Sequence, residues 1–241
     1  MGSGRGKTRR MRSHVGALEV DSGSVLRDDG SREWRVGGGF EGKLHREGGP
    51  ALILADGSEQ WYQHGQLHRD DGPSVEGADG TEQWHQRGKL HRVGGPAKIS
   101  NVIGPRGQVR VWYENGEVHR VDGPAKEYSD GTREWRQHGK LHREGGPAVE
   151  HHGLREWYIN GIQHRDDSPA VEHENGARRW FRDGKLHRLD GPALVDPDGG
   201  EEWWLNGQKL GEEEVKKARA ILLTGHAYEE MKKNFPEKVT F

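Results

Sequence analysis

The chain of 241 residues has no cysteine and only 30% hydrophobic residues. Without cysteine it forms no disulfide framework and no zinc site with thiolate ligands. No run approaches the roughly 18 apolar residues that a membrane-spanning helix needs. The N-terminus lacks an apolar stretch behind its basic residues, so we expect no secretory signal and a cytoplasmic location. The net charge of −2 gives no overall attraction to nucleic acid.

The average composition is that of a disordered chain. Charged residues make up 32% of the sequence, glycine occurs 38 times, and the mean hydropathy is −1.07. So little apolar surface does not offset the entropy of ordering the backbone around one ordinary core. Nine tryptophans are many for a disordered chain, however, and they point to an ordered fold of another kind.

That order is an internal repeat. A His-Arg motif recurs seven times, about every 23 residues, and a proline follows each histidine at the fifth position. The histidines are His45, His68, His91, His119, His142, His164 and His187. A tryptophan precedes each of the last six at the seventh position, and a further one closes the seventh unit: Trp61, Trp84, Trp112, Trp135, Trp157, Trp180 and Trp203. Recurrence at fixed offsets indicates a stacked repeat architecture.

The spacing within a unit predicts a β-hairpin. A glycine stands four residues after every repeat tryptophan, often behind asparagine, and X-Gly between short strands is a two-residue turn. Placing this turn at His64-Gly65 predicts the cross-strand pairs Tyr62–Leu67, Trp61–His68 and Gln60–Arg69. Because side chains alternate along a strand, Trp61 and His68 then share one face and Arg69 lies on the other.

In the regular units all length variation lies between each proline and the next tryptophan; the degenerate first unit, opened by Trp34, is four residues longer before His45. This gap is constant in the other units, but it is five residues longer from Pro96 to Trp112 and one residue shorter from Pro147 to Trp157. Asp-Gly or Asn-Gly usually marks its centre. Insertions concentrate at loop tips, so one edge of the array is variable and the other is fixed. We therefore predict an all-β fold: an elongated, twisted antiparallel meander of about seven 23-residue hairpins, each burying its apolar residues against its neighbours.

The unit resembles a divergent MORN-type repeat. The resemblance rests on Trp-Tyr-x-x-Gly, the histidine that follows it and Asp-Gly before the next aromatic residue, over about Val25 to Leu210. The usual His-Gly-x-Gly is replaced by His-Arg-x-x-Gly-Pro, which resembles arrays in uncharacterised phage and bacterial proteins. The resemblance implies a non-catalytic binding or scaffold element, and an antitoxin-like or inhibitory role.

The sequence divides into three parts: a basic arm at 1–16, the repeat array at 17–210 and a helical cap at 211–241. Residues 1–13 carry +5 and no acid, so the remainder carries −7. We expect the arm to be disordered, and it is either a solubilising leader or a phosphate-seeking segment. Glu212 to Glu214 begin a helix whose Val215, Ala218, Ile221 and Leu222 share a face, and a second helix follows at about 226–234. The segment either covers the last hairpin or recruits a partner.

The arginine of each motif forms a regular row, and it is our first candidate for binding a partner. Its members are Arg46, Arg69, Arg92, Arg120, Arg143, Arg165 and Arg188. Such guanidiniums bind phosphate or acidic partners, or they pair locally. We favour local pairing, with Arg143 facing Glu134 and Arg165 facing Glu156, and with the aspartates that follow the motifs.

We expect no metal and no cofactor. Equivalent residues of neighbouring hairpins lie roughly 9–10 Å apart, too far for two motif histidines to share an ion. The motif histidines should instead pack on the tryptophans opposite them, as a structural ladder. His151-His152 falls in a turn and reads as a weak surface pair.

Nothing in the sequence indicates catalysis. There is no phosphate loop, no nucleophile elbow and no motif histidine that occurs only once. The insertion at 100–107 adds further candidate contact residues, namely Val102, Ile103 and Arg106. We therefore predict a protein-binding module; the alternatives are a self-associating structural subunit and a binder of nucleic acid or anionic surfaces through the arginines and the basic arm.

Overall fold

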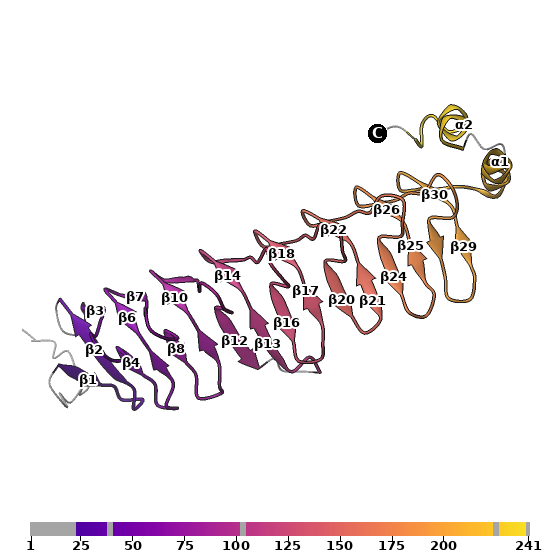
Figure 1. Ribbon diagram of the computed structural model, residues 1–241. Coiled ribbons are helices and arrows are strands. Elements are labelled where there is room, and N and C mark those ends of the chain that lie inside the picture. The colour runs from indigo at the N-terminus through magenta and orange to yellow at the C-terminus, as the bar shows by residue number, and fades with distance from the viewer. Residues whose placement is uncertain (1–22, 38–40, 102–104, 224–226, 240–241) are drawn as a thin grey trace, which may run out of the picture.

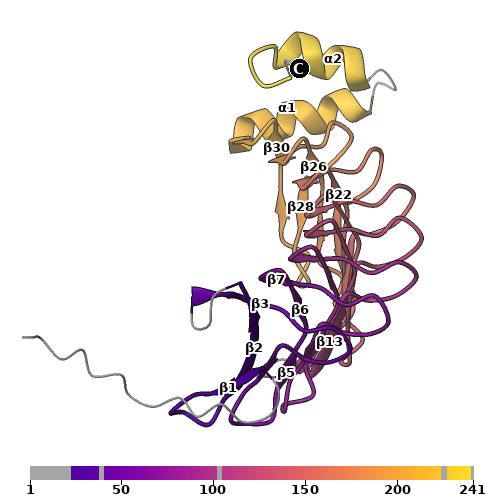
Figure 2. The ribbon, with the colours of Figure 1, turned by 90° about the vertical axis from the view of Figure 1, so that its left-hand side faces the viewer.

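The repeats form one long, open antiparallel sheet. The computed structural model describes residues 23–37, 41–101, 105–223 and 227–239, and within them 31 strands and two helices. Figure 1 shows the strands side by side along an elongated molecule, with both helices at the end opposite β1. Figure 2, which looks along the array, shows successive repeats turned relative to one another, as sheet twist requires. The predicted all-β meander with a small helical end is confirmed.

The main sheet contains 17 strands, and consecutive strands pair antiparallel along its length. They are β1 (Ser24–Leu26), β2 (Arg32–Val36), β3 (Lys43–Leu44), β4 (Leu52–Ile53), β5 (Glu59–Gln60), β8 (Val75–Glu76), β9 (Glu82–Gln83), β12 (Lys98–Asn101), β13 (Gln108–Val111), β16 (Lys126–Tyr128), β17 (Arg133–Glu134), β20 (Val149–His151), β21 (Leu154–Glu156), β24 (Val171–His173), β25 (Arg178–Arg179), β28 (Leu194–Val195) and β29 (Glu201–Glu202).

After each of the last seven tryptophans the chain leaves the main sheet and forms a short hairpin of its own. These strands are β6 (Tyr62–Gln63), β7 (Gln66–Leu67), β10 (His85–Gln86), β11 (Lys89–Leu90), β14 (Tyr113–Glu114), β15 (Glu117–Val118), β18 (Arg136–Gln137), β19 (Lys140–Leu141), β22 (Tyr158–Ile159), β23 (Ile162–Gln163), β26 (Phe181–Arg182), β27 (Lys185–Leu186), β30 (Trp204–Leu205) and β31 (Gln208–Lys209).

The predicted register of the short hairpin is confirmed up to the tryptophan. Tyr62 pairs with Leu67, and the backbone N–H of His68 donates to the carbonyl of Trp61. The turn residues have φ of 49° at His64 and 84° at Gly65, as a primed turn requires. The predicted Gln60–Arg69 pair is wrong, because Gln60 belongs to the main sheet, where it pairs with Leu52 and Val75.

The motif histidines join one repeat to the next. In each of the seven, Nδ1 accepts the backbone N–H of the residue that begins the following hairpin turn, at 3.1–3.2 Å. The next N–H, from the turn glycine, donates to a carbonyl of the preceding hairpin, as from Gly65 to Leu44. The two backbone N–H groups of each hairpin turn therefore both donate to the preceding repeat, and neither is left without an acceptor.

A row of alternating large and small side chains crosses the main sheet. From Trp112 to Trp180 each tryptophan lies beside an alanine on both neighbouring strands: the N–H of Trp112, for example, donates to the carbonyl of Ala125. The alanines are fully buried, whereas most repeat tryptophans are half-buried. Between Trp61 and Trp84 the small residue is Ser74 instead of alanine, and its hydroxyl is 2.8 Å from Nδ1 of the buried His85.

The motif arginines lie on the tryptophans. Each guanidinium carbon is 3.8–4.2 Å from the centre of the indole ring of its unit, within cation–π range. Each Nη1 also donates to the carbonyl of the motif proline, at 3.0–3.3 Å. The prediction that arginine and tryptophan occupy opposite faces is therefore wrong, since the chain bends between Trp61 and Arg69 and brings them together.

The residue before the motif proline packs against the guanidinium. It is glycine in six units and Ser168 in one, where Arg165 still lies 3.8 Å from the Trp157 ring centre. A Cβ on Gly146 would lie 2.9 Å from the guanidinium carbon of Arg143, closer than ordinary van der Waals contact. The sequence His-Arg-x-x-Gly-Pro therefore encodes one structural unit: the arginine covers the indole, donates to the proline carbonyl and packs on the glycine.

At the variable edge, length changes alter the hairpin loops without disturbing the sheet. The five extra residues before Trp112 lengthen β12 and β13, so that Asn101 pairs with Gln108. The one-residue deletion before Trp157 converts a three-residue loop into a two-residue turn at His152 and Gly153, with φ of 40° and 75°. Both changes leave the tryptophan row in place.

The only hydrophobic cluster of the described residues is at the C-terminal end. Helices α1 (Glu212–Leu222) and α2 (Ala227–Asn234) pack on the last hairpin. The cluster contains Trp203, Leu205, Leu210, Ala218, Ile221, Met231, Phe235 and Val239. Val215 and Leu222 pack against it, as the helical spacing predicted, so the segment covers the end of the sheet.

Candidate protein-binding face

The face of the main sheet that carries the tryptophans also carries a second row, two residues from the first, which we call the charge row. The strand register places its members opposite one another on successive strands. In order they are Leu26, Arg32, Ile53, Glu59, Glu76, Glu82, Ile99, Arg110, Glu127, Arg133, Glu150, Arg155, Glu172, Arg178, Val195 and Glu201. Opposite residues on one face lie about 5 Å apart, so their charges interact.

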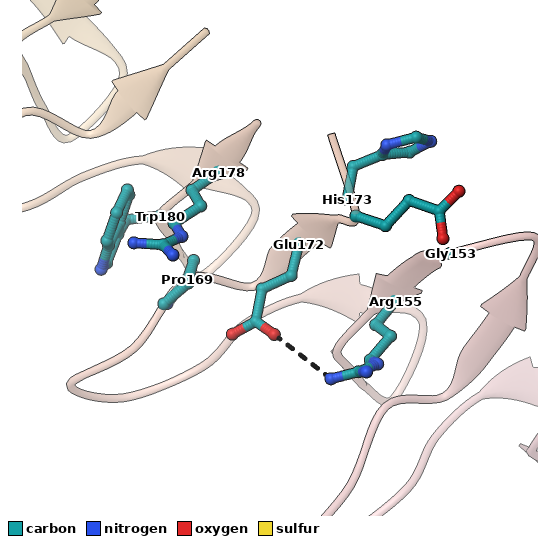
Figure 3. Close-up of a pocket in the computed structure, with 8 residues that line it drawn as sticks. Gly153, Arg155, Pro169, Glu172, His173, Arg178 and Trp180 are labelled. Carbon is teal, nitrogen blue, oxygen red and sulfur yellow. Dashed lines mark ion pairs between the residues drawn. The ribbon is translucent and has the colours of Figure 1, made fainter. Parts of the chain in front are cut away.

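From β13 to β25 the charges of this row alternate. Arginine and glutamate face each other across six consecutive strand pairs, from Arg110 to Arg178. Figure 3 shows one such pair, in which Arg155 Nη1 lies 3.8 Å from Glu172 Oε2. Two of these facing pairs are ion pairs, Arg133–Glu150 at 3.9 Å and Arg155–Glu172, and the alternation places each glutamate of this part between two arginines.

From β5 to β9 the same row holds three glutamates in succession. Glu59 faces Glu76, and Glu76 faces Glu82, while Ile53 and Ile99 stand at the two ends. Glu76 pairs with Arg69 at 2.8 Å, but within the described residues neither Glu59 nor Glu82 forms an ion pair. Like charges directly opposite destabilise a sheet, so this acidic half lowers the stability of the fold.

The motif arginines follow the same division. Four of them pair with the glutamate of the charge row seven residues on: Arg69 with Glu76, Arg120 with Glu127, Arg143 with Glu150 and Arg165 with Glu172. Arg188 pairs with Asp190. Arg46 and Arg92 have an isoleucine at the corresponding position, and within the described residues they bind no carboxylate. The two arginines without a carboxylate thus flank the acidic half.

Two of the expected local pairs are wrong. Arg143 pairs with Glu150 and not with Glu134, whose carboxylate accepts from Arg136 Nε at 2.8 Å. Arg165 pairs with Glu172 and not with Glu156, which lies on the opposite face. There, burial raises the pKa of the Glu156 carboxyl, and Gln163 donates to it. Pairing with the aspartates after the motif is confirmed for Asp71, Asp122 and Asp190.

Shallow grooves run between neighbouring repeats on this face. One, of about 390 Å³, is lined by Gly153, Arg155, Pro169, Glu172, His173, Glu174, Arg178 and Trp180. Figure 3 shows Trp180 and Pro169 together at one side of it and the Arg155–Glu172 pair at the other. Another, of about 450 Å³, runs from Arg69 to Arg92 past Trp84 and ends at Val93, whose side chain is 85% exposed.

Of the three candidate contact residues in the insertion, the structure describes only Arg106. Val102 and Ile103 lie outside the described residues, so their expected role stays a prediction. Arg106 is exposed, and its guanidinium carbon is 5.3 Å from the ring centre of Tyr128. Asn101 and Gln108 anchor the base of the insertion, because they bond to Asp79 and Ser129 of the neighbouring loops.

Sequence reasoning missed the acidic half. Glu59, Glu76 and Glu82 stand at ordinary strand positions, and nothing in their local spacing separates them from the other glutamates. The signal was available once the hairpins were aligned on their tryptophans, since Glu59 and Glu82 each precede a tryptophan by two residues. Comparing the charge at this position between units, which is arginine in the four units from Trp112 to Trp180, would have found them.

None of the helices in the described part of the chain is both long enough and apolar enough to cross a membrane. Comparison with known protein families finds no family model that matches the chain, and comparison with curated proteins finds no significant match. The MORN-type resemblance therefore stays a prediction.

Proposed function

We propose that the array is a non-catalytic protein-binding module and that its partner docks on the acidic half of the charge row. The observation that carries the proposal is the run Glu59–Glu76–Glu82, in a row whose charges alternate from Arg110 to Arg178. A local rule broken at one place, at a cost in stability, is typical of a functional site. Ile53 and Ile99 add apolar contacts at both ends.

The chemistry of the patch defines its partner. Five adjacent strands span about 19 Å from Ile53 to Ile99, which matches a short basic segment with apolar residues at its ends. Lysine or arginine of the partner would neutralise Glu59 and Glu82. An antitoxin-like inhibitor, as the resemblance implies, is one form of this function: the module would cover a basic surface that its target needs.

Nucleic-acid binding through the arginine row has less support. All seven guanidiniums are already stacked on indoles and bonded to carbonyls, and five bind carboxylates. A phosphate backbone laid along this face would also meet Glu59 and Glu82. Self-association is supported by a different feature, since β1 pairs only with β2 among the described strands and leaves an edge for a second copy.

The experiment is affinity capture of partners with three baits. The wild type is compared with Glu59→Arg/Glu82→Arg, which creates the alternating row Arg–Glu–Arg and so keeps the sheet stable. Arg133→Glu is the matched control, because it creates three adjacent glutamates in the C-terminal half. We expect a partner held by the wild type and by Arg133→Glu and lost from the double variant. Equal capture by all three baits, or no capture at all, would contradict the proposal.

Light scattering tests the alternative. A mass that rises with concentration and is unchanged in Glu59→Arg/Glu82→Arg would favour self-association through β1. A monomer at all concentrations would exclude it.

A further inference from the structure

The loop edge of the sheet carries a cluster of metal-binding groups that takes no part in the proposed binding face. One ligand atom from each of Asp130, His151 and His152 lies within 4.8 Å of the other two. It is the one such three-residue group in the part of the chain that the structure describes. Two of the members are consecutive residues of one turn, and the third comes from the preceding loop.

The one-residue deletion in this unit builds the cluster. It produces the two-residue turn in which His152 has φ of 40°, next to the loop that contains Asp130. β17 follows the Asp130 loop and β20 precedes the His152 turn, and their pairing brings Thr132 beside His151. The hydroxyl of Thr132 hydrogen-bonds Nδ1 of His151, and such support from a neighbouring group is typical of metal-binding histidines.

The aspartate is also held in place. One of its carboxylate oxygens, Oδ1, accepts the backbone N–H of Thr132, while Oδ2 lies 3.7 Å from Nε2 of His152. The Asp130 side chain is only 10% exposed, whereas His152 is 63% exposed and free to adjust.

The ligand set selects the ion. Two imidazoles and one carboxylate suit zinc, nickel or copper, whereas magnesium and calcium prefer oxygen ligands alone. A tetrahedral zinc ion needs ligand atoms about 3.3 Å apart, and these three lie within 4.8 Å of one another, so binding requires them to move closer together. Three protein ligands leave one position for water or another donor.

We propose that Asp130, His151 and His152 bind one divalent transition-metal ion at the loop edge of the array. The site is independent of the acidic half, which lies on other strands and needs no metal. Its expected effect is to join two neighbouring hairpin loops.

The test is calorimetric titration of the chelator-treated full chain with Zn²⁺ and, separately, with Ni²⁺. Asp130→Asn keeps the loop, since Asn175 forms the same backbone contact in a later unit. His152→Asn keeps the turn, because asparagine tolerates positive φ. His64→Asn is the matched control: His64 occupies an equivalent turn position and stacks on His45 with no carboxylate of the cluster.

We expect one ion per chain in the wild type and in His64→Asn, and affinity at least about tenfold weaker in Asp130→Asn and His152→Asn. Unchanged melting temperatures in chelator would show that both variants fold. No saturable binding of either ion, or binding that survives both substitutions, would overturn the proposal, as would equal loss in His64→Asn.

Discussion

The two halves of the charge row have the same strand arrangement and differ in the charges of the side chains that face one another. From Arg110 to Arg178 opposite charges face each other on every strand pair, whereas Glu59, Glu76 and Glu82 place like charges side by side. The tryptophan, arginine, proline and histidine contacts beneath the row are the same in both halves. The repeat unit therefore supplies the stability, and the charge row is free to carry function.

The largest expected effect should be equal in the two halves. Trp61→Ala and Trp135→Ala should each lower the free energy of unfolding by about 2–3 kcal/mol, because each removes a half-buried indole and the guanidinium contact above it. Urea denaturation measures both. Losses as small as those of ordinary surface substitutions would show that the tryptophans are not structural. Unequal losses would mean that the halves differ beneath the charge row as well.

A charge reversal in the alternating half should have the next largest effect. Arg133→Glu puts three glutamates side by side at β16, β17 and β20, and it should cost about 1–2 kcal/mol. Arg133→Gln, which removes the charge without reversing it, should cost less. If both variants unfold at the same urea concentration as the wild type, cross-strand charge does not stabilise this sheet.

The converse change in the acidic half should be stabilising and smaller. Glu59→Arg/Glu82→Arg removes both like-charge contacts of Glu76 and should raise the unfolding free energy by about 0.5–1 kcal/mol. The gain should shrink at high salt, where exposed charges are screened. A loss of stability would mean that the three glutamates are not in conflict.

The smallest effects concern single buried histidines, one in each half. Burial lowers the pKa of His85 and of His187, and Arg182 adds to the shift at His187. The unfolded chain then takes up a proton more readily than the folded one, so stability falls as the pH drops below about 6.5.

A double substitution at Ser74 and His85 tests this pH dependence. Ser74→Ala/His85→Tyr introduces the alanine and the tyrosine that the preceding repeat has at these positions. The variant should lose less stability than the wild type as the pH falls, because the contribution of His85 is absent. Urea midpoints measured at about pH 7.5 and 5.5 report it. The same pH dependence in the variant and the wild type would contradict the assignment.

The sequence predicted the sheet well because the residues that form each hairpin recur at constant spacings. Seven recurrences of Trp, Gly, His and Pro located every short hairpin and its turn, and the helical spacing after Glu212 located the cap. What failed was the geometry between the two kinds of hairpin. Alternation alone put Arg69 opposite Gln60, but the chain bends at the tryptophan, and the side chain folds back over the indole.

The candidate site was less predictable for a physical reason. The motif arginines recur and attract attention, yet recurrence there reflects a shared structural contact. Glu59 and Glu82 form an acidic run only because the strand register places Glu76 between them, opposite both. The same holds for Asp130 and His151, which a register and a shortened turn bring together.

The most direct test of this account is a binding titration of the captured partner against Glu59→Arg/Glu82→Arg. Binding should be at least about tenfold weaker in this variant, which should unfold at the same or a higher urea concentration than the wild type, since the substitution removes the docking charges and relieves their repulsion. Undiminished affinity in that variant would contradict it.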